Sequence, residues 1–185
     1  IFFLSLFSFL NFIENKDNFL LSKKVNLGLD LQGGSYLLLE VDSLPVINQN
    51  LQQKLLNIRK YLKNNKIKYQ KLKLRNQSIN FLINEADIKK FEELFLSKDN
   101  SINLYYNQYR SYQMDYFIEE NMVIIKYSKF GLIEIKNSTL NQSLEIVRRR
   151  IDEVGTKDPT IIRRGNDRIL IELPGLEDPN RVKKL

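Results

Sequence analysis

The sequence predicts an α+β fold in which amphipathic helices alternate with short strands, preceded by a membrane-type segment. Three periodicities support this prediction. Apolar residues recur every three or four positions over 44–63 and 140–154, every second position over 168–173, and almost continuously over 1–13. A spacing of three or four is typical of helices, alternation is typical of half-buried strands, and a continuous apolar run is typical of bilayer segments. With 43% hydrophobic residues, the 185-residue chain can bury a core.

The first segment, residues 1–13, is apolar and aromatic, with no charge before Glu14. It is shorter than the roughly 20 residues that span the hydrocarbon layer of a bilayer. We expect it to be the end of a truncated first transmembrane helix, with residues 14–24 as a linker. A signal-peptide core and a buried soluble helix are the alternatives, although no small-residue cleavage site follows.

A first folded unit is predicted over residues 25–107. Its expected elements are strands at 25–31 and 36–41, a helix at 44–63, strands at 67–74 and 78–83, a helix capped by Asn84, and a strand at 102–106. Residues 32–34 separate the first two strands as a glycine turn. From the strand at 36–41 onward, the order strand, helix, strand, strand, helix, strand predicts the split βαβ, or ferredoxin-like, arrangement.

A second, incomplete unit of the same type is predicted over residues 108–185. Its expected elements are a strand at 122–127, a helix that ends at Val154, a hairpin of strands 160–163 and 168–173, and a helix that begins at Asp178. Gly155 is suited to the left-handed cap of the long helix. Residues 112–118 have the composition of an additional strand, for which the sequence indicates no place in the sheet.

Composition argues against catalysis and against most cofactor chemistry. The chain has no cysteine and no histidine, which removes thiolate nucleophiles, the usual zinc ligands and the best proton shuttle near neutral pH. We therefore expect no enzyme activity, catalytic residue, cofactor or metal. The net charge of +7 would suit nucleic acid or an anionic membrane, but lysine, asparagine and isoleucine are frequent throughout, which favours solvated surface instead.

The segment 28–34 is the most unusual stretch, because it holds three glycines and one acid. Its residues are Gly28, Leu29, Asp30, Leu31, Gln32, Gly33 and Gly34. A phosphate-binding loop is disfavoured, since no Lys and Ser/Thr pair follows and an apolar strand stands where a helix should begin. A strand crossover that needs glycine backbone freedom is the favoured interpretation.

Two further surfaces are candidates for binding. Arg148, Arg149 and Arg150 could contact nucleic acid or lipid headgroups, but Glu145 stands four residues before Arg149 and Asp152 four after Arg148, which favours ion pairs along a solvated helix. The tyrosines between positions 105 and 116 could line a peptide-binding surface, although tyrosines are also common on sheet surfaces. Their positions are Tyr105, Tyr106, Tyr109, Tyr112 and Tyr116.

Two segments resemble the SecD/SecF family of protein-export subunits. The first is NLGLDLQGGSYLLLEVD at 26–42, and the second is NQSLEIVRRRIDEVGTKDPTIIRRGNDRILIELPG at 141–175, where Arg164 replaces the usual Gln of the family. By this resemblance, segment 28–34 and several later residues are signature positions of structural type. The later positions are Arg148, Arg149, Arg150, Asp152, Gly155, Pro159, Gly165, Arg168, Pro174 and Gly175.

The resemblance also implies a function. Members of the family are inner-membrane proteins that work with SecF and the SecYEG channel, and they use the proton motive force to assist preprotein translocation. The chain would then be the N-terminal part of such a subunit, on the periplasmic side, with its proton-conducting residues elsewhere and no nucleic acid as partner. The alternative is a membrane-tethered basic domain that binds RNA or anionic lipid.

Overall fold

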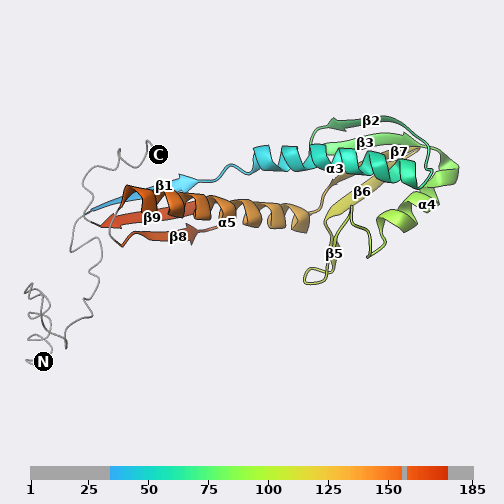
Figure 1. The fold of residues 1–185 in the computed structure, drawn as a ribbon. Helices are drawn as coiled ribbons and strands as arrows, with labels where there is room; N and C mark the ends of the chain where they lie inside the picture. The colour runs from blue at the N-terminus through green and yellow to red at the C-terminus, as the bar shows by residue number, and fades with distance from the viewer. Residues whose placement is uncertain (1–33, 156–157, 175–185) are drawn as a thin grey trace, which may run out of the picture. The chain divides into compact units, whose positions relative to one another are not determined.

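The computed structural model describes residues 34–155 and 158–174 as a chain of strands and helices (Figure 1). The elements are β1 (Gly34–Glu40), α3 (Leu44–Asn64), β2 (Tyr69–Arg75), β3 (Ser78–Ile83), α4 (Glu85–Phe95), β4 (Tyr105–Tyr106), β5 (Ser111–Tyr112), β6 (Met114–Glu119), β7 (Met122–Tyr127), α5 (Lys129–Val154), β8 (Thr160–Arg164) and β9 (Arg168–Pro174). Most of these elements lie within a few residues of the predicted ones. The α+β class is confirmed.

The sheet topology differs from the predicted one. The strands form a four-stranded sheet in the order β2-β3-β7-β6, a three-stranded sheet in the order β1-β9-β8, and the small hairpin β4-β5. The split βαβ arrangement is therefore not confirmed, because the four-stranded sheet combines strands that the prediction had assigned to different units. The segment expected to close the first unit supplies only the two residues of β4, and the strand that could not be placed is the edge strand β6.

Contacts between Cα atoms divide the chain into two compact units. The larger unit contains Leu38–Arg149 and Ile161–Leu170, and the smaller one contains Arg150–Thr160 with parts of the chain before Leu38 and after Leu170. The large unit holds the four-stranded sheet, α3, α4 and the first part of α5.

Helix α3 forms because its apolar residues fall on one face. Ile47, Leu51, Ile58 and Leu62 are buried, at the spacing of three and four that the sequence predicted. Pro45 lies in the first turn, where its missing N–H has no intrahelical partner to lose. Helix α4 follows Asn84, whose extended backbone marks the predicted N-cap position, although its side chain makes no capping hydrogen bond.

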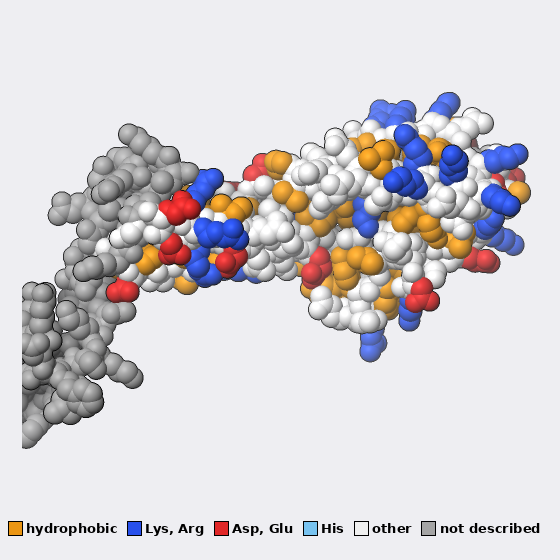
Figure 2. Space-filling view, in the orientation of Figure 1, with side chains coloured by type: hydrophobic (Ala, Val, Ile, Leu, Met, Phe, Trp, Pro, Cys, Tyr) orange, Lys and Arg blue, Asp and Glu red, His pale blue; other side chains and the backbone are white. Residues whose placement is uncertain are grey.

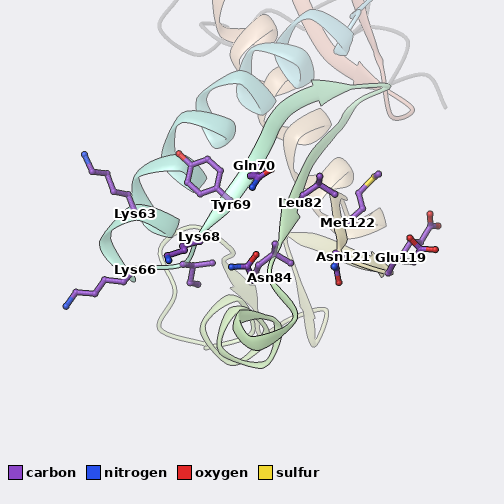
Figure 3. Close-up of a pocket in the computed structure, with 13 residues that line it drawn as sticks. Lys63, Lys66, Lys68, Tyr69, Gln70, Leu82, Asn84, Glu119, Asn121 and Met122 are labelled. Atoms are coloured by element: carbon purple, nitrogen blue, oxygen red, sulfur yellow. The ribbon is translucent and has the colours of Figure 1, made fainter.

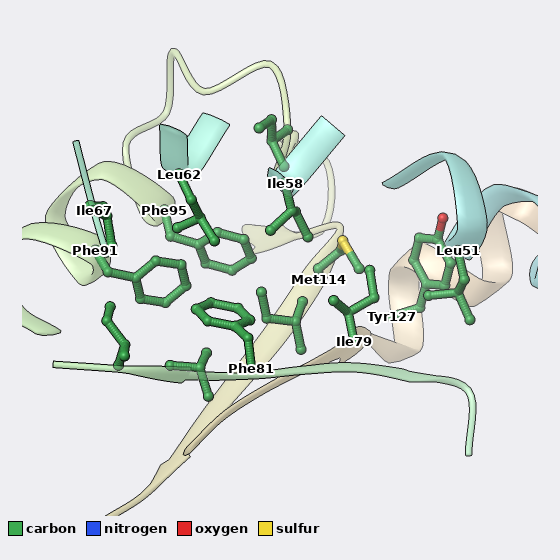
Figure 4. Packing of buried hydrophobic residues seen from close by; sticks show 14 of the residues in the cluster. Leu51, Ile58, Leu62, Ile67, Ile79, Phe81, Phe91, Phe95, Met114 and Tyr127 are labelled. Carbon is green, nitrogen blue, oxygen red and sulfur yellow. The ribbon is translucent and has the colours of Figure 1, made fainter. Parts of the chain in front are cut away.

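The core of the large unit lies between the helices and one face of the four-stranded sheet. Three phenylalanines pack at its centre: Phe81 of β3 meets Phe91 edge-on at a ring-centroid distance of 5.7 Å, and Phe91 stacks on Phe95 at 5.2 Å (Figure 4). All three are at most 1% exposed. Interactions between aromatic rings of this geometry add to the free energy gained by burial.

Two buried asparagines tie the segment after α4 to the core. The side-chain amide of Asn100 donates to the Leu94 carbonyl at 2.9 Å, and its oxygen accepts from the Ile102 backbone N–H at 2.8 Å. Asn103 donates to the Met114 carbonyl at 3.1 Å and accepts from the Met114 N–H at 2.8 Å. These bonds satisfy polar groups that burial would otherwise leave without partners.

The start of α5 lies very close to the segment that precedes β6. The Ser128 hydroxyl accepts from the Gly131 N–H at 3.0 Å and donates to the Tyr112 carbonyl at 2.7 Å, so Ser128 caps the helix and anchors it. Gly131 is buried, and a Cβ built on it would overlap the Gln113 carbonyl oxygen. Only glycine permits this approach of the two backbones.

The elements of the second signature segment match their prediction. Ile169, Ile171 and Leu173 alternate along β9 and are at most 1% exposed. Gly155, at φ +72°, ends α5 in the left-handed conformation that was expected. The segments 1–33 and 175–185, with the expected membrane segment, lie outside the described residues, and none of the helices described is long and apolar enough to cross a membrane.

Replacing Gly131 by alanine is predicted to destabilise the chain. At an ordinary helical position this change stabilises, because alanine has the higher helix propensity. Here we expect the free energy of unfolding to fall by about 2 kcal/mol, since the new methyl group forces two backbones apart. Urea denaturation followed by circular dichroism measures the change, with Ser138→Ala on the exposed side of α5 as the control. An unchanged or higher stability for Gly131→Ala would contradict the close approach.

Tyr127 is predicted to make the fold sensitive to alkali. Burial, with a smaller contribution from Tyr106, raises the pKa of Tyr127 to about 12. The unfolded chain loses this proton near pH 10, so stability is complete below about pH 10 and decreases as the pH rises toward 12, by on the order of 2 kcal/mol.

Urea denaturation at a series of pH values tests this dependence. The variant Tyr127→Phe should lose less stability across that range than the unmodified chain does. Tyr36→Phe, which alters a side chain that is 72% exposed, is the control and should follow the unmodified chain. Parallel losses in the unmodified chain and in Tyr127→Phe would show that burial of this hydroxyl does not control the response.

Candidate functional site

The structure describes only part of the predicted signature. Gly34 is the first residue of β1, whereas six residues of the glycine-rich segment and the last predicted position lie outside the described ranges. Those outside are Gly28, Leu29, Asp30, Leu31, Gln32, Gly33 and Gly175. Their assignment as structural positions remains a prediction.

Arg148 and Arg149 of α5 do not form the two predicted ion pairs. Arg148 pairs with Glu145 at 2.6 Å, three residues before it, and not with Asp152. Glu145, which was expected to pair with Arg149, is thus engaged by Arg148. Both partners are about half exposed, so this pair contributes little to stability. The arginines lie on the solvated side of the helix, which agrees with the interpretation favoured from the sequence.

The remaining signature positions lie at turns and ends of elements. Asp152 is exposed near the end of α5, and Pro159 immediately precedes β8. Gly165, at φ +70°, stands in the turn between β8 and β9. Arg168 and Pro174 are the first and last residues of β9. These places suit a structural role, and none of these residues lines the hollow beside the β6–β7 turn of the large unit.

That hollow opens at one end of the four-stranded sheet. It has a volume of about 950 Å³ and is formed by the end of α3, the start of β2, the end of β3 and the β6–β7 turn (Figure 3). The Ile83 N–H donates to the Asn121 carbonyl at 2.9 Å, which holds β3 against that turn. The lining residues are Lys63, Lys66, Ile67, Lys68, Tyr69, Gln70, Leu82, Ile83, Asn84, Glu119, Glu120, Asn121 and Met122.

The charges of the hollow are separated. Lys63 and Lys66 extend from one side, and Glu119 lies on the other beside Asn121 and Met122 (Figure 3). Leu82 and Met122 face each other across the β3–β7 pair, and Met122 is 41% exposed. The hollow thus combines an apolar floor, amide side chains and a cationic rim.

A basic surface extends outward from this rim. Lys and Arg side chains gather over the part of the large unit that contains α3, β2 and α4 (Figure 2). Nine of the 29 basic residues of the chain, but none of its 22 acidic residues, lie between Ser43 and Asn84. Eight of the nine are exposed: Arg59, Lys60, Lys63, Lys66, Lys68, Lys71, Lys73 and Arg75.

The sequence interpretation missed this surface. The even spread of lysine, asparagine and isoleucine indicated solvated surface, whereas the informative signal is the absence of acids between Ser43 and Asn84. The ninth residue, Lys54, is directed inward: its ammonium donates to the Ile102 carbonyl at 2.5 Å, and burial lowers its pKa. Neither of the ion pairs found among the described residues, Arg148–Glu145 and Arg168–Asp167, involves the eight exposed cations.

The tyrosines at 105–116 are engaged inside the unit. The Tyr109 hydroxyl donates to Glu134 at 2.8 Å, a bond that raises its pKa, and its ring stacks on Phe130. The Tyr116 hydroxyl donates to Glu92 at 3.0 Å, and burial followed by this bond raises its pKa. These contacts leave the rings half buried, which favours a structural role over the peptide-binding surface considered from the sequence.

Comparison with protein families gives two matches. The family described as "Protein translocase subunit SecDF, P1 domain, N-terminal" matches residues 140–185, and the "SecD/SecF GG Motif" matches residues 19–43. Both matches include the segments that carried the resemblance in the sequence. The elements α3 to β7 lie between them. A comparison with solved structures found no match.

Named relatives cover almost the whole chain. A "Protein translocase subunit SecD" of Rickettsia prowazekii is 33% identical over 95% of this chain and 32% of its own length. The Rickettsia bellii protein of that name is 34% identical over 95% and 32%, and the Acetobacter pasteurianus protein is 32% identical over 88% and 30%. The chain spans about a third of the length of these relatives. Both signature segments thus match the SecD/SecF family in order, and over 95% of its length the chain is similar to relatives named protein translocase subunit SecD.

Proposed function

We propose that the chain is the periplasmic interaction part of a SecD-type accessory subunit of the protein-export machinery. In this role it assists the translocation of preproteins across the inner membrane, a process driven by the proton motive force. SecF and the SecYEG channel are the proposed partners, and the segment 1–13 is the proposed end of a membrane anchor. The part described by the structure does no chemistry in this proposal and acts by binding and by mechanical support.

The observation that carries the proposal is the order of the two family matches, which flank the folded residues 44–139, here called the lobe. The glycine motif match ends at residue 43, immediately before α3, and the second match begins at residue 140, within α5. Between them the chain forms a sheet with its own aromatic core. A lobe inserted between two signature segments is suited to contact a partner without disturbing either segment.

One observation favours a second candidate function, the binding of RNA or anionic lipid. The stretch from Ser43 to Asn84 carries nine basic residues and no acid, as a protein that binds RNA or anionic lipid would require. Such binding should weaken steeply as salt is added, because bound counterions are released from a phosphate polymer when the protein binds. Contact with a preprotein through a mixed apolar and charged surface should depend on salt less.

Conditional depletion of the full-length gene tests the proposed function. We expect exported proteins to accumulate as unprocessed precursors, and a plasmid copy of the gene to restore their processing. Pulse labelling of a secreted reporter protein measures the precursor fraction, with a cytoplasmic protein as the control for general synthesis. Normal precursor processing after complete depletion would contradict the proposal and would favour the RNA or lipid candidate.

A further inference from the structure

We propose that the hollow and its basic rim bind extended polypeptide segments that carry acidic and apolar residues. This inference rests on the proposed function, because it specifies which segments of a translocating protein the lobe prefers. The proposed partner is a polypeptide. An anionic lipid surface or RNA would be a different partner, and the binding experiment distinguishes them. Three features of the described residues lead to it: charge, lining and shape.

The charge of the rim is available for an external partner. Lys63, Lys66 and Lys68 are exposed within six residues of chain, and neither ion pair of the described residues includes them. The carboxylate of Asp87 in α4 lies on their side and accepts from the Lys68 backbone N–H at 3.4 Å. Exposed cations that lack internal partners attract and orient an acidic segment.

The lining of the hollow suits the rest of such a segment. Leu82 and Met122 provide an apolar floor, and the side-chain amides of Gln70, Asn84 and Asn121 offer both donors and acceptors to a peptide backbone. In an extended segment successive side chains point to opposite sides. Apolar residues can therefore contact the floor while alternate acidic residues face the lysines.

The carboxylates of the hollow define the direction of binding. Glu119 ends β6 on the side opposite Lys63 and Lys66 (Figure 3), and Glu120 follows it in the β6–β7 turn. An acidic side chain is repelled there and attracted at the other side. We therefore expect acids of the bound segment to lie toward the end of α3, and neutral or basic residues to lie toward the β6–β7 turn.

The shape and composition favour polypeptide over the other anionic partners. A membrane surface would contact the exposed lysines but could not enter the hollow to reach its apolar floor. RNA recognition typically uses stacking on exposed aromatic rings or arginine planes, and Tyr69, the aromatic residue of this hollow, is half buried. Lysines also predominate over arginines at the rim, and they lack the planar fork that recognises phosphate.

A peptide-binding measurement with charge variants tests the proposal. The probe is a fluorescein-labelled peptide in which Asp and Leu alternate, compared with the same peptide carrying Asn in place of Asp. Fluorescence anisotropy gives the affinity for the whole chain in an uncharged detergent. We expect the Asp peptide to bind more tightly, and the variant Lys63→Gln/Lys66→Gln/Lys68→Gln to bind it about tenfold more weakly, as the loss of three exposed charge pairs implies.

Two further variants make the test specific. Lys98→Gln/Lys129→Gln/Lys136→Gln removes the same net charge from exposed positions outside the hollow, and it should change the affinity by less than about twofold. Met122→Gln removes part of the apolar floor at a position that is 41% exposed, and it should weaken binding by about threefold. Circular dichroism confirms that each variant is folded.

The outcomes are distinguishable. Equal affinities for the Asp and Asn peptides, or equal losses in the two lysine variants, would overturn the proposal. So would binding of phosphatidylglycerol vesicles or single-stranded RNA that depends on Lys63, Lys66 and Lys68 while peptide binding does not. If gene depletion still impairs export in any of these cases, the proposed function stands and only the preference for acidic segments is withdrawn.

Discussion

The antiparallel pairing of β3 with β7 is the constraint on which the large unit depends. Helix α4, the β4–β5 hairpin and strand β6 lie between the two strands in the sequence. The strands nevertheless align Ile79 with Ile125 and Phe81 with Val123. Because side chains alternate along a strand, this register places the apolar residues of both strands on the same face. A slip by one residue would expose them and turn Ser78 and Asn80 of β3, or Lys126 of β7, toward the core.

The same pairing creates the hollow. It brings Leu82 beside Met122, and the hydrogen bond from Ile83 to Asn121 extends the contact to the β6–β7 turn. The lysines reach the hollow from the other direction, because α3 packs over the sheet through Ile58 and Leu62. The residues of the hollow thus depend on the core for their positions, although most of them contribute little to it.

The lobe also shows how a binding surface can remain exposed in a stable fold. Buried asparagines and Ser128 hold the irregular segments through hydrogen bonds, and the tyrosines use their hydroxyls for internal contacts. Among the described residues, no side-chain hydrogen bond or ion pair uses a basic side chain between Ser43 and Asn84 other than that of Lys54. The other basic side chains in this range therefore do not hold the fold together. Their number and positions can change with the partner that the lobe contacts.

The sequence by itself determined the class of the fold, most of its elements and the family. Periodicity located α3, β3, β7 and β9 to within about a residue, because burial of one face imposes a pattern that is local in the chain. The glycine-rich and arginine-containing segments identified the family for a similar reason, since both motifs are contiguous. Only the tertiary structure decided which strands pair and where the lysines gather. These properties depend on contacts between distant residues, and a pattern of burial specifies a face without specifying its partner.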